Sequence, residues 1–143
     1  FAKDIVHDGE GSQKFIEVKV CGAKSMEDAK ILAKSIVTDN LVKTAMYGED
    51  ANWGRVMAAM GSSGGYFDPS KADIAFESEK GLIQLMRKGE PIAFDENLAA
   101  EILSDYDITI DIFLGDGTGY ATAWGCDLGH EYVRINGEYR SRT

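Results

Sequence analysis

Two runs of alternating apolar and polar residues, separated by "GDGTG", most constrain what this chain can fold into. The apolar residues that share one face of the first run are Ile108, Ile110, Ile112 and Leu114. The second run alternates in the same way through Tyr120, Thr122 and Trp124. A period of two is typical of half-buried strands, and a short glycine-rich connection favours a β-hairpin. The sequence therefore predicts two strands over residues 107–126, joined as a hairpin.

Three more segments have the pattern of strands. The stretch "KFIEVKVCG" alternates after two glycines, with Ile16, Val18 and Val20 on one face. The runs "ADIAFES" and "GLIQLMRKGEPIAF" also read as strands, and the second is expected to turn near Lys88 and Gly89. These segments give the predicted sheet at least five strands.

Three segments have the spacing of amphipathic helices. The run "SMEDAKILAKSIV" begins with Ser25 as the expected N-cap, a second helix is expected from about Asn52 to Met60, and "DENLAAEILSD" has Asp95 as its cap. The mixture predicts an α/β (α+β) sandwich, that is, a mixed sheet packed with helices. No repeat or linker divides the chain, so residues 1–143 are expected to form one domain.

The composition narrows the function classes. The chain has 24 acidic residues against 15 basic ones, a net charge of −9, which argues against nonspecific nucleic-acid binding. No apolar run approaches the roughly 20 residues that span a bilayer, so no membrane role and a cytoplasmic location are expected. Phe1, Ile5 and Val6 share a helical face, so the chain is expected to be a fragment that begins in the last turns of a helix.

The residues alone do not supply a complete catalytic set. His7 and His130 lack metal-ligand spacing, so no metal site is expected. Cys21 and Cys126 are far apart and without a CxxC partner, and they are expected to be buried free thiols. The stretch "GSSGG" lacks the lysine of a phosphate-binding loop.

Glu10 stands between Gly9 and Gly11, just before the first strand. A solvated turn is one interpretation of this stretch. The other is a carboxylate offered to a ligand at close range, because flanking glycines have no Cβ to block the approach. The residues by themselves leave both interpretations open.

Four stretches of the sequence, taken together, resemble a known family. In order and at the right intervals, "DGEGSQKFIEVKV", "LVKTAMYGEDANWGRVMAAMG", "FDENLAAEIL" and "ATAWGCDLGHEYVRINGEYR" resemble the C-terminal half of ornithine acetyltransferases. The resemblance covers essentially the whole chain. It implies the later part of the β chain of a self-cleaving enzyme, and the α/β fold of that family.

The resemblance also implies a reaction. Family members move an acetyl group from N-acetylornithine to glutamate through a ping-pong mechanism, in which the N-terminal threonine of the β chain is the nucleophile. No metal or organic cofactor is implied. The expected partners are the α chain and the N-terminal part of the β chain, in a hetero-oligomer. Whether acetyl-CoA also serves as donor stays open. The threonine lies upstream in the family, so this chain alone is expected to be inactive.

Three site residues carry over from the family pattern. Glu10 matches the glutamate of "GEG" and is expected to bind substrate and act in catalysis, by holding the α-ammonium or taking its proton. Asn136 and Ser141 match the substrate-binding positions near the family's C-terminus, although Arg142 and Thr143 extend past them here. Two alternatives remain: a non-catalytic assembly domain, and a related self-cleaving amide hydrolase or acyltransferase.

Overall fold

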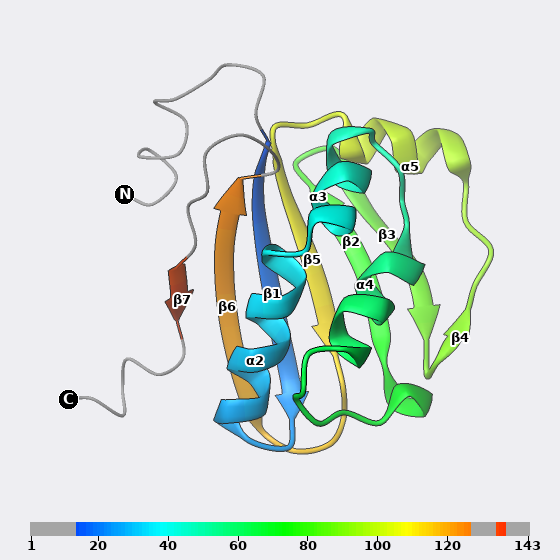
Figure 1. Cartoon of the computed structure of the whole chain (residues 1–143). Coiled ribbons are helices and arrows are strands. Elements are labelled where there is room, and N and C mark those ends of the chain that lie inside the picture. Colours follow the sequence, from blue (N-terminus) through cyan, green and yellow to red (C-terminus); the bar gives the residue numbers. More distant parts are fainter. Residues whose placement is uncertain (1–13, 127–133, 137–143) are drawn as a thin grey trace.

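The computed structural model describes residues 14–126 and 134–136 of the chain. These residues build one seven-stranded sheet with the strand order β4-β3-β2-β5-β1-β6-β7 (Figure 1). The strands are β1 (Phe15–Ala23), β2 (Asp73–Ser78), β3 (Gly81–Arg87), β4 (Glu90–Pro91), β5 (Asp107–Phe113), β6 (Gly119–Cys126) and β7 (Arg134–Asn136). The central pair of β1 and β5 is parallel, and every other pair is antiparallel. The predicted mixed sheet with helices is confirmed.

The helices begin where side-chain oxygens cap them. They are α2 (Met26–Val37), α3 (Asn40–Tyr47), α4 (Trp53–Gly61) and α5 (Glu96–Leu103), with a short 3-10 turn η1 at Pro69–Lys71. Ser25 and Asp95 accept backbone N–H groups of α2 and α5, as predicted. Asn52, the expected start of the second helix, caps α4 by accepting the backbone N–H of Arg55. No helix of the described residues is both long and apolar enough to cross a bilayer.

Helix α3 was not expected from the sequence. It has only eight residues and follows α2 after Thr38 and Asp39, so the periodic signal is short and lies close to a stronger one. Asp39 caps it by accepting the backbone N–H groups of Leu41 and Val42. Burial of Val42 and Met46 against the main core stabilises this short helix.

All four helices pack on one face of the sheet (Figure 1). The apolar residues of β1 and β5 that point to this face are fully buried, including Val18, Val20 and Ile110. Phe76 and Leu85 extend the same core across β2 and β3. We call this side the covered face and the opposite side the open face.

The predicted hairpin over residues 107–126 is wrong. Strands β5 and β6 do not pair with each other, because β1 lies between them, parallel to β5 and antiparallel to β6. The "GDGTG" connection passes around the end of β1, where the N–H groups of Asp116 and Gly117 donate to the carbonyl of Gly22 at 2.7 and 2.9 Å. Gly22 has a φ of +76°, and a Cβ there would lie 2.8 Å from the nitrogen of Gly115. The glycine-rich segment is therefore the connection that crosses from β5 past β1 to β6, and not a hairpin turn.

The strand expected over residues 81–94 is divided into β3 and β4. The turn between them lies at Lys88 and Gly89, as predicted, and both residues have positive φ angles of 48° and 76°. Glu90 and Pro91 pair back with β3, and the backbone N–H of Ile92 adds one more hydrogen bond to the carbonyl of Leu85 at 3.1 Å.

The two cysteines have different surroundings. Both are free thiols, as predicted. Cys126 is buried beside Phe15, which confirms its assignment to the core. Cys21 is exposed, so the prediction that it is buried is wrong. It falls at an odd position of β1, and odd positions of this strand point to the open face.

Candidate functional site

The open face is built from four rows of residues that lie opposite one another across adjacent strands. The pairing follows from the registers of β3, β2, β5, β1 and β6. One of them, the polar row, continues onto β7 and consists of Gln84, Ala75, Asp111, Lys19, Thr122 and Asn136. The predicted substrate residue Asn136 thus occupies the end of a polar row that includes a lysine and a carboxylate.

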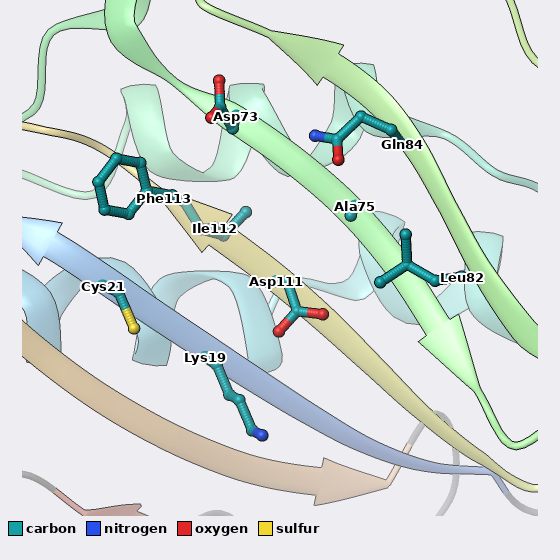
Figure 2. A pocket seen from close by; sticks show the side chains of 9 residues that line it. All are labelled: Lys19, Cys21, Asp73, Ala75, Leu82, Gln84, Asp111, Ile112 and Phe113. Atoms are coloured by element: carbon teal, nitrogen blue, oxygen red, sulfur yellow. The ribbon is translucent and has the colours of Figure 1, made fainter.

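A shallow depression of about 360 Å³ lies over this face. Figure 2 shows it from the open side, with the helices behind the strands. Its lining residues come from four strands and are Lys19, Cys21, Asp73, Ala75, Leu82, Gln84, Asp111, Ile112 and Phe113. The lining therefore combines apolar side chains with one basic and two acidic groups.

Asp111 is the most perturbed ionisable group on the open face. Burial, the largest cause, and repulsion from Glu77 together raise the pKa of its carboxyl to about 6. Lys19, its register partner on β1, partly offsets these effects, and Glu17 adds to them. Asp111 can therefore exchange a proton near neutral pH, which an ordinary surface aspartate does not do.

Glu17 ties three strands together at the end of the sheet where β1 begins. Its carboxylate accepts the indole Nε1–H of Trp124 at 2.8 Å and the hydroxyl of Thr109 at 3.2 Å. Trp124 also packs against the small buried cluster of Phe15 and Cys126. A charged acceptor with two donors makes this end of the open face well ordered.

Lys14 anchors the chain as it enters β1. Its ammonium group is buried and donates to the carbonyl oxygens of Leu103 and Asp105, at 2.8 and 2.9 Å. The Oε2 atom of Glu49 lies 4.0 Å from the Lys14 Nζ. Lys14 thus caps the C-terminal end of α5, where backbone carbonyls lack helical partners. It holds a point only four residues after Glu10.

The structure places one of the three predicted site residues. Asn136 lies in β7, opposite Thr122. Its neighbour Ile135 packs against the main core, so this part of the C-terminal segment is attached to the body of the sheet. Glu10 and Ser141 lie outside the described residues, as do His7 and His130.

Sequence reasoning did not single out Lys14, Lys19 or Asp111. Their signal was present, since each is a charged residue inside or beside an apolar run that forms a strand. A charge in such a run is usually solvated, and only the register shows that Lys19 and Asp111 are partners on adjacent strands.

The described part of the chain can bind and order polar groups, but it does not contain a nucleophile paired with a base. The thiol of Cys21 has no histidine among the described residues. Within the same residues, no group of three or more His, Cys, Asp or Glu side chains could hold a metal ion.

A mixed sheet covered by helices on one face, with a polar row and a depression on the other, defines an α/β-sandwich domain. The chain belongs to the ArgJ family, whose sequence profile matches residues 1–141.

Relatives and a solved structure agree with this assignment. The chain is 51% identical over 140 residues to a protein of Caldanaerobacter subterraneus subsp. tengcongensis named arginine biosynthesis bifunctional protein ArgJ. It is 49% identical over 146 residues to the mitochondrial ArgJ protein of Lodderomyces elongisporus. These matches cover 98% of this chain but 35% and 33% of the relatives, so the chain spans about a third of their length.

The crystal structure of the arginine biosynthesis bifunctional protein ArgJ from Bacillus halodurans has the same fold. The two structures superpose with a TM-score of 0.79 at 40% sequence identity. The match covers 99% of this chain and 63% of the crystallised one. The fold of the family and that of this chain are therefore the same over these residues.

Proposed function

We propose that this chain is the C-terminal part of an acetyltransferase that moves an acetyl group from N-acetylornithine to glutamate in arginine biosynthesis. The observation that carries the proposal is the 51% identity, over 98% of the chain, to a protein named arginine biosynthesis bifunctional protein ArgJ. The nucleophilic threonine is supplied by a part of the enzyme outside these 143 residues. The partners are the α chain and the N-terminal part of the β chain, and no cofactor takes part.

Each predicted residue has a chemical task in this reaction. The threonine hydroxyl attacks the acetyl carbonyl of N-acetylornithine, and ornithine leaves with a proton on its amine. Glu10 takes a proton from the α-ammonium group of glutamate, whose free amine then attacks the acyl-threonine. The ester bond breaks, the threonine hydroxyl regains its proton, and N-acetylglutamate leaves. Asn136 and Ser141 offer neutral hydrogen bonds that orient the amino-acid substrate.

The register of the sheet is compatible with a site shared by Glu10 and Asn136. Asn136 is two strands away from β1, or about 10 Å, and lies level with Lys19. Lys19 is four residues, or about 13 Å, from Phe15. The separation between Phe15 and Asn136 is therefore about 16 Å. The five residues from Glu10 to Phe15 can span at most about 17–18 Å, so covalent geometry permits the meeting.

The test uses a chimera, in which these 143 residues replace the matching part of the Caldanaerobacter relative. In the chimera, Glu10→Gln keeps the size of the side chain but removes its charge and basicity. The value of kcat/KM for acetyl transfer should fall by about two to four orders of magnitude. Thermal melting should change little, because the substitution removes no apolar burial.

The matched control is Asp8→Asn, which removes a carboxylate two residues away. This variant should keep nearly the full kcat/KM of the chimera. Normal turnover in Glu10→Gln, or an equal loss in Asp8→Asn, would return the Gly-Glu-Gly stretch to an ordinary surface turn.

An assembly role is the second candidate, and the open face of the sheet favours it. A domain that only holds the enzyme together would still need its docking surface, but Glu10→Gln would then leave acetyl transfer unchanged. The same measurement separates the two functions. A related amide hydrolase would instead release acetate from N-acetylornithine when no glutamate is present.

A further inference from the structure

The two faces of the sheet are covered unequally. All four helices pack on the covered face, and no helix or strand of the described residues packs on the open face (Figures 1 and 2). The pair at the centre of the sheet, β1 and β5, is parallel. All-parallel sheets are covered on both faces, whereas antiparallel sheets tolerate water on one face. This sheet is mixed, with one parallel pair, so its open face has to be judged by the side chains that it exposes.

Large apolar side chains are exposed on the open face. Leu82 is 53% exposed on β3, and Phe113 is 52% exposed on β5. Tyr120 is 38% exposed on β6. Phe113 and Tyr120 both lie opposite the exposed Cys21, so these three residues form a continuous row across three strands. Exposed apolar groups that share one face mark interaction surfaces more often than single ones do.

The charges on the open face indicate which kind of partner can dock there. Five carboxylates lie on the open face of the described strands, from Glu17, Asp73, Glu77, Asp107 and Asp111, against two basic side chains, Lys19 and Arg87. A second copy that docked through the same face would bring two acidic surfaces together, which is unfavourable. A partner with basic or hydrogen-bond-donating side chains would be complementary instead.

The part of the related proteins that lies outside the match is a candidate for such a partner. This chain covers 63% of the crystallised Bacillus halodurans chain and about 35% of the Caldanaerobacter relative. About two thirds of the Caldanaerobacter polypeptide and about a third of the crystallised chain thus lie outside the matched part, and this remainder can supply an occupant for the open face. The open face offers apolar side chains and unbalanced charge in one continuous area.

We propose that the open face is the surface on which the rest of the ArgJ polypeptide docks. The occupant places apolar side chains over the row of Phe113, Cys21 and Tyr120. It places basic or donating side chains opposite the carboxylates of β2 and β5. This inference rests on the proposal that the chain works as part of a longer enzyme, and it adds the surface and the chemistry of the contact.

Thiol labelling in the chimera tests this proposal. Leu82→Cys places a thiol on the open face, and Leu41→Cys places one on α3, where the native leucine is 60% exposed. The two native side chains are similarly exposed, so the two thiols should react equally fast if both surfaces are free. If the open face is covered, a maleimide should modify position 82 at least tenfold more slowly than position 41. Native Cys21 should be slow as well.

Three outcomes decide the proposal. Slow labelling at positions 82 and 21 that does not change on dilution supports docking of the rest of the polypeptide. Equal rates at positions 82 and 41 overturn it. Slow labelling that becomes fast on dilution shows a second copy on this face and also overturns it.

The labelling result is independent of the proposed reaction. An inactive chimera with a protected position 82 would contradict the acetyl transfer and keep the docking surface. An active chimera with a reactive position 82 would support the acetyl transfer and contradict the docking surface.

Discussion

The covered and open faces of the sheet come from the same strands, yet they differ in almost every physical property. On β5, Ile108, Ile110 and Ile112 are at most 2% exposed, whereas Thr109 and Asp111 between them are only half-buried. The covered face is a continuous apolar core. The open face combines charges, hydroxyls and exposed apolar groups.

The contrast shows which face stabilises the fold and which face keeps polar groups accessible. Close packing on the covered face leaves no room for chemistry, because a polar group buried there would lose its hydration. The open face keeps titratable and hydrogen-bonding groups in fixed register, and its polar row leads to Asn136. Three substitutions in the 143-residue chain, in order of expected effect, can sharpen or break this comparison.

Ile110→Ala should have the largest effect, because it leaves a cavity at the centre of the covered face. Ile110 is 0% exposed, and such truncations cost about 2–5 kcal/mol. The adjacent Thr109→Ala, which loses only its hydrogen bond to Glu17, should cost less than about 1 kcal/mol. Denaturant unfolding of both variants measures the difference. Equal losses would show that the two faces stabilise the fold equally.

Trp124→Phe, a substitution on the open face, should lower the free energy of unfolding by an intermediate amount. It removes the indole N–H that donates to Glu17 but keeps an aromatic ring over Phe15 and Cys126. We expect a loss of about 1–2 kcal/mol, because a hydrogen bond to a charged acceptor is stronger than a neutral one. Glu17→Gln keeps an acceptor for the indole and should cost less. A larger loss in Glu17→Gln would contradict this account of the contact.

Asp111→Asn should change the free energy of unfolding least, and the change should stabilise the fold. Burial and Glu77 raise the pKa of Asp111 to about 6, above its usual 3.8, so the folded state disfavours the ionised carboxyl. The stability that the protonated form contributes is complete below about pH 4 and is lost as the pH rises through 6. At pH 7 the amide should gain about 0.5–1 kcal/mol, a value reduced for solvent screening of a half-exposed group.

The check is a pH series of melting temperatures for the chain and for Asp111→Asn. The two curves should converge below about pH 4 and separate above pH 6. Curves that stay parallel from pH 4 to pH 7 would mean that Asp111 does not titrate in this range.

Local features of the fold were predictable because they depend on neighbouring residues alone. Ser25, Asn52 and Asp95 cap helices with their own side chains, and the turn at Lys88 and Gly89 needs only residues that adopt positive φ. The alternation of β1 and β5 showed in the same way which residues point to the core. The hydrophobic periodicity of the short helix α3, which closely follows α2, was too weak to predict that helix.

The resemblance of the four sequence strings led to the family and to three candidate site residues. Of these, the structure describes only Asn136, which lies in β7. The polar row to which it belongs could not be predicted, because Lys19, Asp111 and Thr122 are far apart in the sequence and meet only through strand register.

By itself, the sequence determined most of the elements, the buried side of β1 and β5 and the family, because side-chain periodicity and local capping are encoded within each segment. Only the tertiary structure decided that β1 lies between β5 and β6, in place of the hairpin that their alternation suggested. An alternating strand carries the same pattern whichever neighbour it pairs with. The choice depends instead on how the whole sheet buries its covered face, and that choice brought Lys19 beside Asp111 on the open one.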